Sequence, residues 1–179
     1  MKKFISALSV SFLLLSGVGG LSSIEASASV KQAASSKIDQ KKAQPYINDT
    51  ISPAAYNIAI ELFEDSSYYF GEPMEEYFEG KGSYEDVQLW AKEYLKVHKY
   101  NIELLSDLKT KLFMTKAQNN EVLTMKREFK ASADSMKALA ELILATPESK
   151  FDKTFSYKLL KPVRHSKNGT FAVYRLVNK

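Results

Sequence analysis

The 179-residue sequence contains no cysteine, which excludes disulfide bonds, thiolate metal ligands and cysteine nucleophiles. A lipid-anchored bacterial exported protein needs a cysteine where its signal peptide is cut, and Ser29 stands at that position here. Histidine is almost as rare. His98 falls on the apolar side of an expected helix, where we interpret it as a boundary residue bonded to a neighbour. His165 lies in a basic stretch, where we expect it to be solvated.

The usual sequence signatures of catalysis are also missing. There is no G-x-S-x-G, no P-loop, no G-x-G-x-x-G, no H-E-x-x-H and no calcium-binding loop of the EF-hand type. We therefore predict no cofactor, no metal and no catalytic residue. One enzymatic alternative stays open, because a carboxylate-based hydrolase needs only two carboxylates at a fixed separation, and Glu75, Glu76 and Glu79 could supply them.

One long apolar run stands at the beginning of the chain. Residues 1–3 are basic, residues 4–21 carry no charge, and Ala26 and Ala28 are the small residues that signal peptidase reads. This order predicts a signal peptide over residues 1–28, cleaved after Ala28, and therefore a secreted protein. A permanent membrane anchor is the alternative, although the run is short and contains glycine and serine. Export without disulfides, in a chain with many lysines and tyrosines, favours a Gram-positive bacterium.

The remaining chain divides by composition. Residues 29–50 are rich in lysine, serine, alanine and glutamine, and they predict a flexible leader. Residues 51–179 predict a single helical domain. Ser52 and Pro53 open its first helix, because serine caps a helix and proline suits the first turn. We expect Gly71 and Pro73 to stop this helix.

Two long amphipathic helices follow. Apolar residues recur every three or four positions over residues 83–115, beginning with a capping box formed by Ser83 and Asp86. We expect a polar turn at residues 118–120 and the end of the next helix at Pro147. Two such helices joined by a short turn predict an antiparallel hairpin, and with it a mainly α helical bundle. The apolar side of the second helix comprises Val122, Met125, Phe129, Ala133, Met136, Leu139, Ala140 and Ile143.

The end of the chain, residues 151–179, has a different pattern. Two short runs rich in aromatic and aliphatic residues, 155–160 and 170–177, flank Asn168-Gly169. Asn-Gly is a strong hairpin signal because both residues tolerate positive φ. We predict a small C-terminal β-hairpin packed on the helices, with an extended basic segment as the alternative.

Charge is divided along the chain. Residues 61–86, the acidic segment, hold nine acidic residues against one lysine, a net charge of −8. Residues 150–179, the basic segment, hold eight basic residues against one aspartate, a net charge of +7. Either the two segments attract each other within the fold, or one or both meet a charged partner.

These charges suggest a function through binding rather than chemistry. We expect a secreted, non-enzymatic binding or modulatory protein of the bacterial cell envelope or extracellular medium, whose partner is an anionic cell-wall polymer or another secreted protein. Contact with a membrane is an option that the sequence does not favour. Nucleic acid is not expected, because no recognition motif accompanies the basic residues. The alternatives are a membrane-active, toxin-like helical protein and the carboxylate-based hydrolase. The candidate contact residues are Lys158, Lys161, Arg164, Lys167 and Arg175 on the basic side, and Glu72, Glu75, Glu76, Tyr77 and Glu79 on the acidic side.

Overall fold

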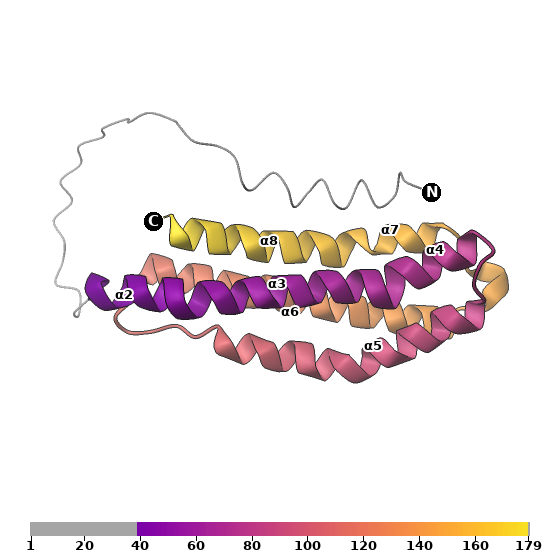
Figure 1. Cartoon of the computed structure of the whole chain (residues 1–179), viewed down its shortest axis with the longest axis horizontal. Coiled ribbons are helices and arrows are strands. Elements are labelled where there is room, and N and C mark those ends of the chain that lie inside the picture. The colour runs from indigo at the N-terminus through magenta and orange to yellow at the C-terminus, as the bar shows by residue number, and fades with distance from the viewer. Residues whose placement is uncertain (1–38, 179) are drawn as a thin grey trace, which may run out of the picture. The chain divides into compact units, whose positions relative to one another are not determined.

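A computed structural model describes residues 39–178, and the predicted signal peptide lies outside them. Within the described residues the chain is helical and contains no β-strand, so the prediction of a mainly α bundle is confirmed. Four helical arms make up the bundle (Figure 1). The first arm comprises α2 (Gln40–Tyr46), η1 (Ile47–Ile51), α3 (Ser52–Ser66), η2 (Ser67–Gly71) and α4 (Glu72–Phe78). The second comprises α5 (Tyr84–Leu104) and η3 (Leu105–Asp107), the third α6 (Lys116–Ala145), and the fourth η4 (Glu148–Lys150), α7 (Thr154–Lys158) and α8 (Leu160–Val177).

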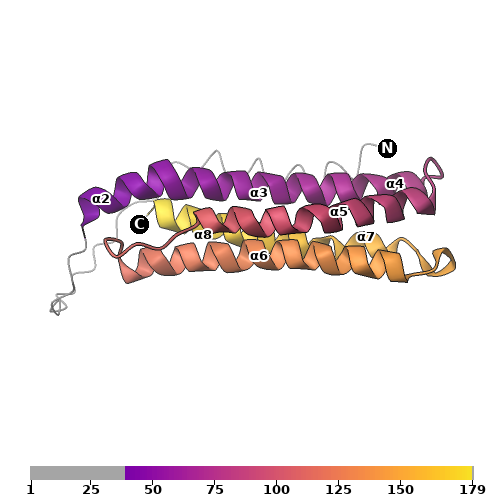
Figure 2. The ribbon, with the colours of Figure 1, turned by 90° about the horizontal axis from the view of Figure 1, so that it is seen from below.

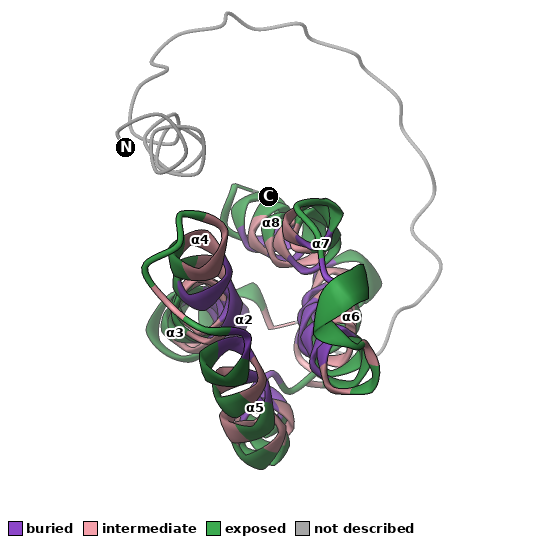
Figure 3. Cartoon of the chain, turned by 90° about the vertical axis from the view of Figure 1, so that its right-hand side faces the viewer, coloured by how far each residue is buried: buried purple, intermediate pink, exposed green. Residues whose placement is uncertain are grey.

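Successive arms run in opposite directions, as Figures 1 and 2 show. Each arm packs on the next, and α8 closes the bundle by packing on both α6 and α3. Seen from the end, the buried residues of the arms face the middle (Figure 3). The predicted antiparallel pairing of α5 with α6 is confirmed, but the closest neighbour of α6 is α8.

The first arm is longer than the sequence predicted, because it continues through three prolines, of which Pro45 lies inside α2. Pro53 and Pro73 each follow a π-helical segment by two residues, namely η1 and η2. In these segments the backbone N–H donates to the carbonyl five residues back, as from Ser52 to Ile47. A proline ring clashes with the carbonyl four residues before it, and the wider π turn makes room for that ring. The prediction that Gly71 and Pro73 stop the helix was therefore wrong.

The prediction of a flexible leader up to residue 50 was also wrong for residues 40–50, which are helical. Ala43, Ile47 and Ile51 recur at intervals of four and are completely buried in the core. Three apolar residues at this spacing hold the segment on the bundle, although polar residues surround them.

The second arm ends earlier than expected. Its start is as predicted, since Ser83 and Asp86 form the capping box. However, α5 ends at Leu104 rather than running to residue 115, and a new capping box formed by Thr115 and Gln118 begins α6 where we expected a turn. The connection is held by Asn119, whose side-chain amide both accepts from and donates to the backbone of Lys111, at 3.0 and 2.9 Å.

The third arm follows the sequence closely. All eight apolar residues predicted for one side of this helix are buried, none more than 4% exposed. The helix ends at Ala145, with Thr146 as its C-cap and Pro147 beyond it, as predicted. Its apolar side therefore supplies the centre of the bundle.

The fourth arm corrects the prediction of a β-hairpin or extended basic segment, because Asn168 and Gly169 lie inside the helix α8. Gly169 is needed for packing rather than for a turn. A Cβ atom at this position would lie only 2.4 Å from the ring of Phe129 on α6. The absence of a side chain thus lets the two helices approach closely. A slight break at Leu159 separates α7 from α8, where Pro162 has no N–H to donate to Lys158.

We predict that Gly169→Ala lowers the free energy of unfolding by about 1–3 kcal/mol, because the buried Phe129 ring has no room to move aside. Chemical denaturation monitored by circular dichroism measures this change. Gly71→Ala is the matched control, since its Cβ would meet the Ser66 carbonyl at an ordinary 3.5 Å. There the better helix propensity of alanine should stabilise the fold by about 0.5–1 kcal/mol. Equal effects at both positions would contradict the packing role of Gly169.

Candidate interaction surfaces

On the acidic side, the structure separates Tyr77 from the glutamates near it. Glu72 and Glu76 on α4 and Glu79 after it are exposed, and Glu75 is half-buried. Tyr77 instead packs into the bundle end, and its hydroxyl donates to Glu148 at 3.3 Å. Its partners are an aromatic cluster formed with Phe78, Tyr84, Phe151 and Phe155.

This aromatic cluster connects the end of the first arm with the beginning of the fourth. Phe78 stacks on Phe151 at 5.3 Å, and Phe151 in turn contacts Phe155 on α7 at 4.6 Å. Tyr84 donates to the carbonyls of Ile143 and Thr146, at 2.8 and 2.7 Å, which ties the same cluster to the end of α6. The aromatic residues at this end of the acidic segment are therefore largely part of the core.

On the basic side, all five predicted residues lie exposed on one arm, and four of them are grouped within residues 158–167. Lys158 is on α7, and Lys161, Arg164 and Lys167 are on α8 at intervals of three. None of the four lies within ion-pair distance of a carboxylate in the described part of the chain. Two of them instead cover aromatic rings, since Lys158 lies over Phe155 and Lys167 over Phe171, at 5.4 and 5.6 Å.

Arg175 differs from those four. Its guanidinium forms an ion pair with Glu121 on α6, with Nε at 3.1 Å and Nη2 at 3.0 Å from the carboxylate. Nearer the beginning of α8, the ring of His165 contacts the carboxylate of Glu128 on α6 at 2.9 Å. The expectation that His165 is simply solvated was therefore wrong. Hydrogen bonding by His165, and less so by Arg127, holds the pKa of Glu128 below its usual value despite partial burial. Arg175 and His165 therefore fasten α8 to α6.

The acidic and basic segments meet only in part. The helices α3 and α8 are neighbours in the bundle, which brings the two segments side by side. Yet the ion pairs found on α8 in the described residues lead to α6. Glu79 pairs with Lys81 at 2.6 Å, which lowers the pKa of Glu79, and Lys153 adds a smaller effect in the same direction. The ion pairs of α8 therefore link it to α6, while Lys153 influences Glu79 of the acidic segment through its charge.

Apolar side chains are also exposed on the fourth arm. Their exposed fractions run from 38% at Val177 to 65% at Tyr157. The set comprises Tyr157, Leu160, Phe171, Tyr174 and Val177. Together with Lys158, Lys161, Arg164 and Lys167 they form what we call the α8 face, a surface that is both basic and apolar.

Polar side chains also form contacts between the helices of the bundle. The Asn101 side-chain amide donates to the carboxylate of Asp65 at 2.5 Å, across the seam between α5 and α3. Burial raises the pKa of Asp65, and the nearby Glu61 raises it further, while the Asn101 hydrogen bond opposes the shift. The buried Tyr94 donates to the carbonyl of Ala133 at 3.0 Å, and its pKa is raised strongly by burial.

His98, the other histidine, also contacts a neighbouring helix. His98 Nε2 lies 3.2 Å from Asp134 on α6, so the interpretation of His98 as a boundary residue bonded to a neighbour is confirmed. Burial alone would raise the pKa of Asp134, but hydrogen bonds from Lys130 and His98 outweigh it and the pKa is lowered. These contacts join helices, as polar groups in a bundle interior commonly do.

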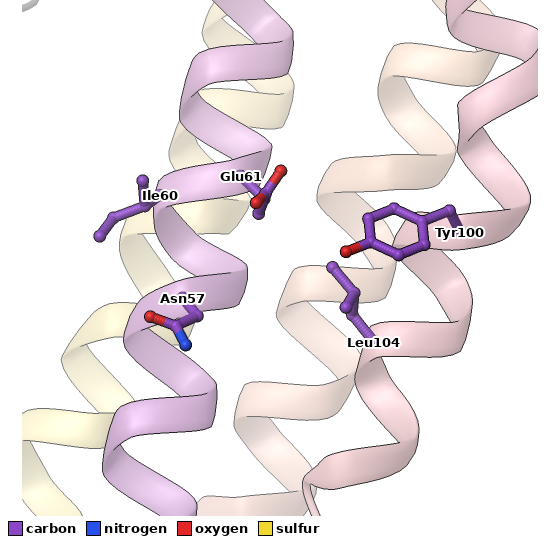
Figure 4. A pocket seen from close by; sticks show the side chains of 5 residues that line it. All are labelled: Asn57, Ile60, Glu61, Tyr100 and Leu104. Atoms are coloured by element: carbon purple, nitrogen blue, oxygen red, sulfur yellow. The ribbon is translucent and has the colours of Figure 1, made fainter.

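A hollow of about 210 Å³ opens between α3 and α5 (Figure 4). Tyr100 and Leu104 reach into it from α5, and Asn57 and Glu61 face them from α3. Glu61 is the one carboxylate among its lining residues, whereas a hydrolase of the kind considered needs two that converge. In the part of the chain described, no group of three histidine, aspartate or glutamate side chains is arranged to hold a metal ion.

Comparison with known protein families, with curated proteins and with solved structures finds no match to this chain. None of the helices in residues 39–178 combines the length and apolar character needed to cross a membrane.

We predict that Asp65→Asn raises the free energy of unfolding at neutral pH. The raised pKa means that the folded state holds the Asp65 proton more tightly than the unfolded state, so the charge destabilises the fold above the usual pKa of 3.8. The advantage of the variant should shrink as the pH falls through the raised pKa of folded Asp65 towards 3.8, and it should be lost below 3.8. Urea denaturation at a series of pH values measures it. A variant that is less stable than the parent at pH 7 would contradict the assignment.

Glu128→Gln should act in the opposite direction. Because the pKa of Glu128 is lowered in the fold, its charge stabilises the protein above the usual pKa of 4.5, and this contribution is lost as the pH falls through the folded value. We expect the variant to be less stable at neutral pH and to approach the parent in acid. The control is Glu141→Gln on the exposed side of α6, whose 3.8 Å contact with Lys137 should contribute little.

Proposed function

We propose that this chain is a secreted, non-enzymatic binding protein of the cell envelope, and that it holds an anionic partner on the α8 face. One observation carries the proposal: Lys158, Lys161, Arg164 and Lys167 lie exposed on one arm, and no carboxylate within residues 39–178 pairs with them. Export is supported by the signal peptide that the sequence predicts over residues 1–28.

The helices α7 and α8 carry an excess of positive charge. No acidic residue follows Asp152 in the sequence, so α7 and α8 carry basic residues alone. Lys161, Arg164 and Lys167 follow one another at three-residue steps, which corresponds to about 4.5 Å of rise along the helix for each step. A row of uncompensated cations at this spacing suits a partner with repeated negative charges, such as a phosphate-bearing polymer or surface.

The bundle supports binding better than catalysis. The half-buried carboxylate of Asp65 accepts a hydrogen bond from Asn101, and His98 and His165 are each bonded to a carboxylate in a contact that joins helices. The interior thus serves to hold four arms together, which leaves the charged outer surfaces as the places where a partner can act.

We predict that the triple variant Lys161→Glu, Arg164→Glu, Lys167→Glu is retained at least tenfold less by immobilised poly(glycerol phosphate). Each basic residue near an anionic surface contributes about 1 kcal/mol, and reversal adds repulsion. Retention of the parent protein should fall as sodium chloride screens the charges. Affinity measured across a salt series provides the test.

The matched control reverses three exposed lysines on other arms, as Lys92→Glu, Lys116→Glu, Lys126→Glu. It changes the net charge by the same amount but leaves the α8 face intact. Equal loss of retention in the two triple variants would show that net charge, and not this face, holds the partner. Retention that does not depend on salt would also count against the proposal.

A further inference from the structure

We infer that the anionic partner of the α8 face is the surface of a lipid bilayer with negatively charged headgroups. This rests on the proposed function, because it names the class of partner for the same face. The inference comes from the apolar side chains that share the face with the cations.

These apolar side chains are concentrated. Of the thirteen large hydrophobic residues that are exposed in the described part of the chain, five belong to α7 and α8. Phe171 is 41% exposed and Tyr174 54%, on the last third of the arm, while Tyr157 and Leu160 are exposed at its beginning. The cations stand between these two apolar ends.

The helical period places cations and apolar groups on the same side of α8. Arg164, Lys167, Phe171 and Tyr174 follow one another at steps of three or four, so they project from one side of the helix. The opposite side is buried in the bundle and comprises Pro162, Gly169, Ala172, Val173 and Leu176. The face that looks outward thus carries its cations up to Lys167 and, beyond them, the apolar side chains of Phe171 and Tyr174.

The chemistry of the face distinguishes a bilayer from a soluble polymer. A phosphodiester chain in water would pair with Lys161, Arg164 and Lys167, but it would leave Phe171 and Tyr174 exposed to solvent. A bilayer surface offers phosphates for the cations and, a few ångströms deeper, an apolar layer in which aromatic side chains are favoured. One surface therefore satisfies both sets of side chains at once.

The contacts of α8 make this a peripheral attachment. Ser132 donates to the carbonyl of Pro162 at 2.8 Å, and the ring of Phe129 packs directly on Gly169. With Arg175 also paired to Glu121, α8 is fixed on α6 over most of its length. The helix therefore lies on the bilayer as part of the folded bundle, and it binds without opening the membrane.

The test is sedimentation of residues 29–179, the chain that follows the predicted signal peptide, with two kinds of vesicle. One kind is an equimolar mixture of phosphatidylglycerol and phosphatidylcholine, and the other is phosphatidylcholine alone. We expect binding to the first and not to the second. The variant Phe171→Ser, Tyr174→Ser should bind at least tenfold more weakly, with an unchanged circular dichroism spectrum, because the apolar part of the contact is lost.

The matched control is Leu89→Ser, Tyr100→Ser on α5, where the parent side chains are 50% and 53% exposed. It should bind vesicles like the parent. Full binding by the Phe171, Tyr174 variant would overturn the bilayer inference, and so would leakage of an enclosed dye, which would indicate a membrane-active protein. Binding to poly(glycerol phosphate) but not to vesicles would overturn this inference and leave the proposed function standing. Binding to neither would remove both.

Discussion

The contact between the Phe129 ring and the bare backbone of Gly169 is the constraint on which the rest of the bundle depends. The ring lies where a Cβ atom at position 169 would stand, near the middle of both α6 and α8. With this contact in place, Ser132 reaches the carbonyl of Pro162, and Glu121 meets Arg175 near the end of α8. The pairing in turn decides which side of α8 is buried and which side looks outward. The α8 face is therefore a consequence of packing rather than a separate feature.

In the first arm, the backbone is irregular at two π-helical turns, and each turn lies just before a proline. Pro53 and Pro73 would normally end a helix, yet the π-helical turns η1 and η2 give each of these rings its space. The buried residues Ile47, Ile51 and Phe70 within these turns keep the arm attached to the core on either side. A single continuous arm can then cover both α5 and α8, and it carries most of the acidic segment past the basic one.

Polar groups inside the bundle act at its seams. Asp65 with Asn101 joins the first arm to the second, His98 with Asp134 joins the second to the third, and Glu128 with His165 joins the third to the fourth. Their pKa shifts differ in sign, because burial dominates at Asp65 whereas hydrogen bonds dominate at Glu128. These polar contacts therefore serve to join neighbouring arms of the bundle.

The sequence alone determined the helical class, the eight buried residues of α6, the capping of α5 by Ser83 and the unequal distribution of charge, because each is a local pattern of side chains along a helix or chain. It also pointed to the basic residues that lie exposed on α7 and α8. Tertiary structure decided the rest. Asn168-Gly169 reads locally as a turn, and only the nearness of Phe129, forty residues away along the chain, makes glycine necessary inside a helix. The local sequence predicts Tyr77 to be a surface anchor, but in the structure Phe151 packs on it. It likewise predicts a free Arg175, which in the structure pairs with Glu121. Such outcomes depend on partners distant in sequence, which no local pattern contains.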